Sequence, residues 1–194
     1  MTEKPDAIKQ LEFFLKKFID VNEEEIQAFS RNMKLLDLKK GSHLLEIGET
    51  CNVVAFIAKG VLRYYYVANG EENTVQFFFE NGFAADMESF ISGSQSKVGI
   101  DAIENSTLLV IPKKDILELY KTYHKFEHLG RLMAEAAYMG LRKKTNEFLN
   151  MSAEERYLNL IKERPKVMER IPQHYIASYL GIKPQSLSRI RKNL

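Results

Sequence analysis

The residues with the most specific chemistry lie at the C-terminal end of the chain. The 25 residues from Arg170 to Leu194 include basic side chains but no carboxylate. Counted from Gln173 as position one, small residues stand at positions five (Ala177) and nine (Gly181), and apolar residues fill positions four, eight, ten, fifteen and eighteen: Ile176, Leu180, Ile182, Leu187 and Ile190. A small residue at five lets a second helix cross closely, and glycine at nine permits a positive φ in the turn. The spacing predicts a helix-turn-helix.

This segment also has the side chains that bind nucleic acid. Pro184 would lie in the first turn of the second helix, where its missing N–H costs nothing. An ordinary amphipathic helix pair would need only the apolar matches, whereas the added Ala177, Gly181 and purely basic charge favour double-stranded DNA as the partner. The residues predicted to contact DNA are Gln173, His174, Lys183, Pro184, Gln185, Ser186, Ser188, Arg189, Arg191 and Lys192.

Charge is distributed unevenly along the chain. Residues 1–125 hold 15 Lys/Arg and 19 Asp/Glu, net −4, whereas residues 126–194 hold 13 and 7, net +6. A polyanion would therefore be drawn to the C-terminal third. Apolar and charged contents of 45% and 28% are typical of a globular protein of one or two domains. With no signal peptide and no long apolar run, we expect a cytoplasmic protein without membrane contact.

Catalytic and metal-binding patterns are missing from the sequence. The single cysteine, Cys51, excludes an intrachain disulfide and a four-cysteine cluster. The four histidines lack the spacing of metal ligands, and no Ser/His/Asp grouping or phosphate-cradling glycine loop is evident. We therefore expect neither an enzyme nor a metal or cofactor site, and we interpret Cys51 as a buried, inert thiol.

The elements that must position the C-terminal segment form three regions. Pro5 begins an amphipathic helix that includes Phe18 on its apolar side, and Asn22 caps a second helix that ends near Met33. From Leu35 to Ile111, short apolar runs alternate with Gly and Asn, which predicts a β-sandwich or β-roll interrupted by a short helix at Met87–Ile91. Within it, Asn69-Gly70 predicts a two-residue hairpin turn between Leu62–Val67 and Thr74–Phe79. Helices resume at Lys113 after Pro112.

A long helix is predicted from Lys125 to Asn150. Its apolar and small residues form a seam that either packs on the β domain or pairs with a second chain, and we favour pairing because two helix-turn-helix units read adjacent major-groove turns as a dimer. The predicted dimerisation residues are Leu129, Leu132, Met133, Ala136, Met139 and Gly140. Ser152 and Glu155 form a capping box for a helix over Ala153–Glu163, which Pro165 ends.

This order of elements resembles the Crp/Fnr family of bacterial transcription regulators, and the C-terminal sequence looks like a branch common in Bacteroidetes. The closest matches are Gly48-Glu49, the segment Phe56–Val61 and the motif Gln173–Leu194. The resemblance implies an α+β fold: a jelly-roll-like cyclic-nucleotide-binding β-roll flanked by helices over residues 1–125, a dimerisation helix over 126–150, and a helix-turn-helix domain over 151–194. It also implies a homodimer on DNA, with RNA polymerase as a further partner. We expect the helix-turn-helix domain to lack the wing that usually follows the recognition helix in this family.

The β-roll departs from the family pattern at the phosphate-binding cassette. Members that bind cAMP have Gly-Glu-Leu followed by Arg-Ser, whereas here Ala85 replaces Gly and Ser96 replaces Arg. A serine cannot grip a phosphate through two parallel charge-assisted bonds as a guanidinium does. The candidate effector residues are Asp86, Met87, Glu88, Ser89, Ser96, Lys97 and Met139. We expect a DNA-binding regulator with an unidentified effector other than cAMP; the alternative is a β-roll signalling protein that has lost DNA binding.

Overall fold

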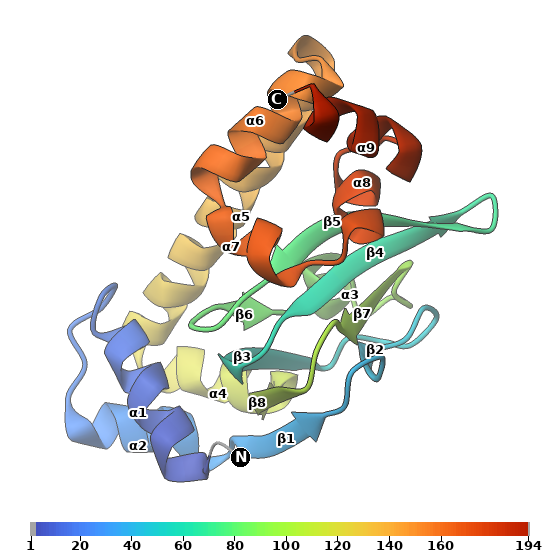
Figure 1. Cartoon of the computed structure of the whole chain (residues 1–194). Helices are drawn as coiled ribbons and strands as arrows, with labels where there is room; N and C mark the ends of the chain where they lie inside the picture. Colours follow the sequence, from blue (N-terminus) through green and yellow to red (C-terminus); the bar gives the residue numbers. More distant parts are fainter. Residues whose placement is uncertain (1–2, 194) are drawn as a thin grey trace. The chain divides into compact units, whose positions relative to one another are not determined.

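The computed structural model describes residues 3–193 as two compact units (Figure 1). The first unit contains the chain up to Tyr64 together with Phe77–Met133. The second contains Tyr65–Gln76 together with the chain from Ala134 onward. The long helix α5 (His124–Asn150) and a β-hairpin therefore each contribute to both units. The division into domains 1–125, 126–150 and 151–194 stays a prediction.

Two four-stranded sheets build the β-roll, as the α+β expectation required. The first has the order β1-β8-β3-β6, with β1 (Lys34–Leu38), β8 (Ser106–Pro112), β3 (Val53–Lys59) and β6 (Phe83–Ala84). The second has the order β2-β7-β4-β5, with β2 (His43–Leu45), β7 (Val98–Ala102), β4 (Leu62–Ala68) and β5 (Glu71–Phe78). The pairs β1/β8, β3/β8, β3/β6 and β2/β7 are antiparallel.

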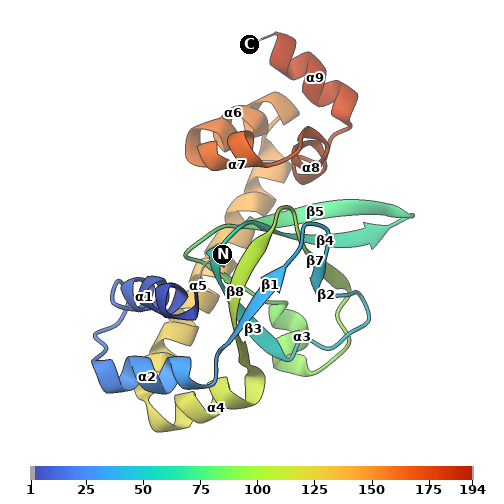
Figure 2. The ribbon, with the colours of Figure 1, turned by 60° about the horizontal axis from the view of Figure 1, so that its bottom comes forward.

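Helices α1 (Lys4–Leu15) and α4 (Lys113–Thr122) lie against β8 in this unit (Figure 2). Because strands β3 and β8 are covered on both faces, they carry nearly continuous apolar runs. Phe14 of α1 packs edge-on against Phe56 and Phe83, with ring centroids 5.8 and 5.4 Å away. The predicted extension of this helix to Phe18 is wrong, because α1 ends at Leu15 and Phe18 is 43% exposed.

The capped helix α2 (Glu23–Arg31) joins the same core. Its predicted cap is present: the Asn22 side chain accepts a hydrogen bond from the Glu25 N–H at 2.9 Å, and the Glu25 carboxylate accepts one from the Asn22 N–H at 2.9 Å. Phe29 of α2 packs on Phe126 of α5, with centroids 4.8 Å apart. The short helix α3 (Met87–Ser92) lies between β6 and β7, as expected.

The hairpin between β4 and β5 has the predicted two-residue turn. Asn69 and Gly70 have φ values of 54° and 76°, which this type of turn requires at both central positions. The outer part of the hairpin, Tyr65–Gln76, belongs to the second unit, whereas the strand ends on either side belong to the roll.

The second unit is otherwise helical. It contains the later part of α5, then α6 (Ala153–Glu163), α7 (Pro165–Arg170), α8 (Gln173–Tyr179) and α9 (Pro184–Lys192). The predicted capping box at Ser152 and Glu155 is present. Pro165 ends α6 and also opens α7, a helix that the sequence did not predict. In residues 3–193, no helix combines the length and apolarity needed to cross a membrane.

Candidate nucleic-acid interface and effector region

The turn between α8 and α9 is held by backbone hydrogen bonds at a left-handed glycine. Gly181 has a φ of 68°, and its N–H donates to the Ser178 carbonyl at 3.0 Å. The next N–H, of Ile182, donates to the Ala177 carbonyl at 3.0 Å. The residues that the register assigns to inward positions include Ile176, Ala177, Leu180 and Leu187, all at most 2% exposed. The two helices therefore pack through the residues that the spacing selected.

Arg156 of α6 supports this turn, a role that the sequence analysis missed. Its guanidinium donates to the Leu180 carbonyl at 3.0 Å and to the Met151 carbonyl at 2.7 Å. It also lies 4.6 Å from the ring centroid of Phe148. A Cβ placed on Gly181 would come within 2.7 Å of that ring. Arg156 thus links the ends of α5 and α8, and the Phe148 ring packs against Gly181.

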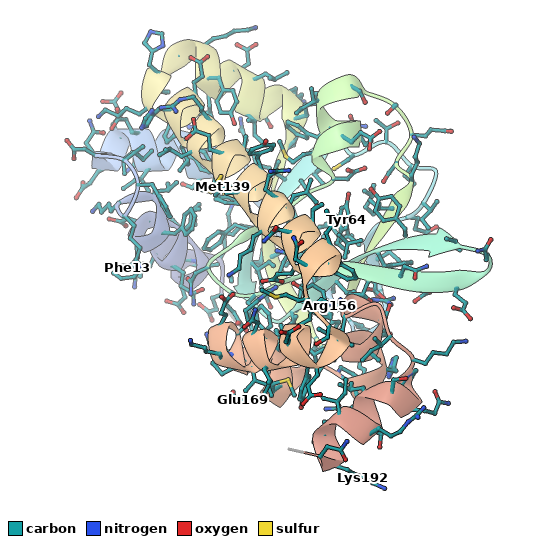
Figure 3. The ribbon with its side chains drawn as sticks, turned by 90° about the horizontal axis from the view of Figure 1, so that it is seen from above. Phe13, Tyr64, Met139, Arg156, Glu169 and Lys192 are labelled. Carbon is teal, nitrogen blue, oxygen red and sulfur yellow. The ribbon has the colours of Figure 1, made fainter. Side chains whose placement is uncertain are left out.

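Amide, hydroxyl and basic side chains lie on the surface of α8 and α9. Nine of the ten predicted DNA contacts are exposed, and Ser186 is half-buried. Arg189, Arg191 and Lys192 form the basic end of α9, and Figure 3 shows Lys192 extending from that end. With no carboxylate in this segment, the surface has the charge and the donors needed to meet phosphates and base edges.

The outward side of α8 is in contact with the β-hairpin. The Ser178 hydroxyl donates to the Glu72 carbonyl at 3.0 Å and accepts from the Thr74 N–H at 2.8 Å. Lys144 of α5 donates to the Val75 carbonyl at 2.6 Å, and its Nζ lies 3.7 Å from the ring centroid of Tyr179. Nothing in the local pattern indicated this contact, because its partners are about a hundred positions apart.

Burial changes the acidity of Lys144. Desolvation of the ammonium, reinforced by positive Arg164 and opposed by Glu147, lowers the pKa of Lys144 to about 7. The cavity beside it, lined among others by Arg156 and Tyr179, measures about 30 Å³. That volume holds at most a water or two, so this cavity is no effector pocket.

In the β-roll, Asp86 and Ser96 are buried and bound to each other. The Ser96 hydroxyl donates to an Asp86 carboxylate oxygen at 2.7 Å, and both residues are 3% exposed. The other carboxylate oxygen accepts from the Glu88 N–H at 3.2 Å, which caps α3, and from the Tyr64 hydroxyl at 3.3 Å. The two cassette positions are therefore bonded to each other in the interior of the β-roll.

The remaining candidate effector residues divide between interior and surface. Ser89 is 1% exposed, accepts from the Cys51 N–H at 2.9 Å and donates to the Ser94 carbonyl at 2.6 Å. Met87, Glu88 and Lys97 are exposed, with 3.9 Å between the Glu88 carboxylate and the Lys97 ammonium. Met139 belongs to the second unit and is 65% exposed.

Cys51 is 2% exposed, and burial raises the pKa of its thiol, the environment expected of an inert cysteine. Across residues 3–193, the side chains form no group of three or more His, Cys, Asp or Glu suited to a metal ion.

The apolar seam of α5 divides at the boundary between the two units. Leu129 is 4% exposed and Met133 is half-buried, both against the core of the first unit. Gly130 lies so close to Tyr120 that an added Cβ would be 2.3 Å from its hydroxyl oxygen. Beyond Met133, Ala136, Met139 and Gly140 are exposed. Packing on the chain's own domain therefore accounts for the first part of the seam only, and dimerisation through the rest stays a prediction.

Comparison with known proteins gave one family match and several solved structures of similar fold. Residues 35–123 match the cyclic nucleotide-binding domain family. The structure is similar to FixK2 from Bradyrhizobium japonicum, with a TM-score of 0.74, 14% identity and 84% of each chain covered. It is also similar to a putative Crp/Fnr-family transcriptional regulator from Eubacterium rectale, with a TM-score of 0.72, 17% identity and coverage of 90% of this chain and 83% of the other.

A third similar structure is the c-di-GMP-responsive global regulator CLP from Xanthomonas campestris, with a TM-score of 0.67, 15% identity and coverage of 89% and 91%. A comparison with curated protein sequences gave no match. At these identities the likeness concerns the fold, and it supports the Crp/Fnr-like architecture expected from the sequence.

Proposed function

We propose that this protein is a homodimeric, sequence-specific DNA-binding transcription regulator of the Crp/Fnr type. The observation that carries the proposal is the exposed, carboxylate-free surface of α9, supported by the Gly181 turn. The fold comparisons support it, because regulators of the Crp/Fnr family share this architecture. The cytoplasm is the compartment in which such a regulator would meet DNA.

Helix α9 would read the major groove. Gln185 can form a bidentate pair with adenine N6 and N7, and Arg189, about one helical turn later, suits guanine O6 and N7. Ser186, Arg191 and Lys192 would contact phosphates, and Ser188 would serve either role. Gln173 and His174 at the start of α8, together with Lys183 and Pro184, would approach the backbone of the same half-site.

The exposed part of the α5 seam supports dimerisation. Met139, in this part of the seam, is 65% exposed, an apolar side chain that an isolated helix leaves in water. The small residues Ala136 and Gly140 would let a second α5 approach closely. Pairing two copies would place two reading helices on adjacent turns of one DNA face.

The β-roll would take an effector other than a cyclic nucleotide. Ser96 occupies the place of the phosphate-binding arginine and is already bonded to Asp86. Lys97, the next residue in the sequence, is exposed, and its ammonium lies 3.9 Å from the Glu88 carboxylate. A phosphate approaching this region would meet Asp86 and Glu88 without a guanidinium to compensate for their charge.

Selection of bound sequences from a random DNA library would test the function. We expect a palindrome with half-sites about one helical turn apart. Arg189→Ala should weaken binding by about 1–3 kcal/mol and relax one base position in each half-site. Lys192→Ala is the matched control: it should weaken all sequences alike and flatten the salt dependence by about one unit per half-site. Enrichment of no motif would support the alternative, a β-roll signalling protein without DNA binding.

A further inference from the structure

The outer part of the β4–β5 hairpin is attached to the helices and not only to its own sheet. Ser178 holds it at two points, since one hydroxyl accepts the Thr74 N–H and donates to the Glu72 carbonyl. Lys144 adds a third point through the Val75 carbonyl. Thr74 is 4% exposed. These contacts place residues 65–76 in the same compact unit as α8 and α9.

The attached segment, residues 65–76, is negatively charged, which is unfavourable for binding DNA. Between Tyr65 and Gln76 there are two carboxylates, Glu71 and Glu72, and no Lys or Arg. Both residues are exposed. The two acidic side chains of the hairpin contrast with the region from Arg170 onward, which has no acidic side chain. The hairpin thus brings negative charge to a unit whose predicted partner is a polyanion.

The attachment point lies on the side of α8 that we expect to face a DNA phosphate. His174 and Ser178 are four residues apart, so their side chains lie on one face of the helix, with Cβ atoms about 5–6 Å apart. Because the Glu72 carbonyl is bonded to Ser178, the hairpin backbone at Glu72 lies about one helical turn from His174, a spacing shorter than the Debye length of about 8 Å at physiological ionic strength. A phosphate that approached His174 would therefore be repelled by the hairpin.

We propose that the hairpin at residues 65–76 is an autoinhibitory lock, which Ser178 holds on the outward face of α8 and whose carboxylates oppose the binding of DNA. The inference rests on the proposed function, because it assigns regulation to the same DNA-binding surface. In the locked arrangement the affinity for DNA is low, and it increases when Ser178 releases the Glu72 and Thr74 backbone. The lock does not require the hairpin to contact α9 as well.

The affinity of the full-length protein for its selected palindrome tests the lock. Ser178→Ala removes both hydrogen bonds, and because each one changes the locked-to-open ratio by about fivefold, DNA should bind at least about fivefold and up to about 25-fold more tightly. Ser178→Thr keeps the hydroxyl and should retain the wild-type affinity. Glu71→Gln with Glu72→Gln should also tighten binding, by a factor that decreases as salt increases. The control Glu154→Gln removes a carboxylate elsewhere in the same unit and should change affinity less. Unchanged or weaker binding by Ser178→Ala would overturn the lock.

Hydrogen exchange of the Thr74 amide separates this proposal from the proposed function. The amide should be protected in the wild type and exchange faster in Ser178→Ala, while the amides of α6 stay unchanged. An unprotected Thr74 amide in a protein that binds DNA would refute the lock alone. A protected amide, with no DNA binding by the wild type or by Ser178→Ala, would refute the proposed function instead.

Discussion

Lys144 makes the stability of the second unit dependent on pH. Its ammonium donates to the Val75 carbonyl and lies over the Tyr179 ring, both of which favour the charged form. Burial opposes them more strongly, with positive Arg164 acting in the same direction and Glu147 against it. The pKa of Lys144 therefore decreases from 10.5 to about 7 on folding.

The sign of the effect follows from proton uptake. Between pH 7 and 10.5 the unfolded chain keeps the proton of Lys144 while the folded chain has lost it, so the free energy of unfolding increases with pH. Below pH 7 both states are protonated and the folded protein bears the full cost of the buried charge. For the pKa of about 7, this group alone should add about 2 kcal/mol to the free energy of unfolding between pH 7 and pH 9.

Lys144→Met removes the titrating group but keeps the length of the side chain. In urea unfolding at pH 7, 8 and 9, the wild type should gain stability relative to this variant as pH increases, because all other titrating groups are shared. Lys143→Met is the matched control: Lys143 is exposed and paired with Glu163, and that pairing raises its pKa. Its pH profile should run parallel to that of the wild type over the same range. If the profile of Lys144→Met is parallel as well, the lysine does not change its pKa on folding.

Three further outcomes are expected. Isothermal titration with cAMP or cGMP should show no low-micromolar binding; a binding signal that Lys97→Ala abolished would mean that Lys97 replaces the missing arginine. The double variant Ala136→Glu with Met139→Glu should give monomers in sedimentation. The control Ala134→Glu, about 160° around the helix from Ala136, should stay dimeric. A dimeric double variant would exclude this face of α5 as the dimer contact. Gly181→Ala should reduce the free energy of unfolding by about 1–2 kcal/mol, because alanine at a φ of 68° is strained; unchanged urea unfolding would contradict this.

Local chemistry explains which parts of the fold the sequence could predict. The Asn69-Gly70 turn and the caps at Asn22 and Ser152 depend on residues within a few positions of one another. At the caps a side chain bonds the backbone three residues away, and at the turn both residues tolerate a positive φ, so each short motif is sufficient to determine its conformation. The Gly181 turn follows the same rule, since its positive φ is required by the turn itself.

Which helix surfaces are covered by distant parts of the chain could not be predicted from such short motifs. The apolar stripe of α5 continues from Leu129 to Gly140 without a change in pattern, yet its first half is buried and its second half exposed. The difference in burial depends on where the core of the first unit ends. The periodicity of one helix does not indicate that position. The Ser178 contact with the hairpin is equally nonlocal, and serine is too common on helix surfaces to indicate a partner.

The buried pair of Asp86 and Ser96 shows that a neighbouring residue can occupy the hydrogen-bonding groups of a predicted site residue. From the sequence, Asp86 was a candidate effector residue whose carboxylate could accept a hydrogen bond from a ligand. In the structure its oxygens already accept from Ser96, from the Glu88 N–H and from the Tyr64 hydroxyl. A ligand that used Asp86 would have to displace one of these donors; the Ser96 hydroxyl could then donate to the Val98 carbonyl, 2.9 Å away. Because a carboxylate accepts hydrogen bonds and does not donate them, such a ligand must present a hydroxyl or amide donor, and the charge of Asp86 opposes a phosphate. An effector of the β-roll is thus expected to be recognised as a hydrogen-bond donor, with Met87, Glu88 and Lys97 forming the exposed side of its site.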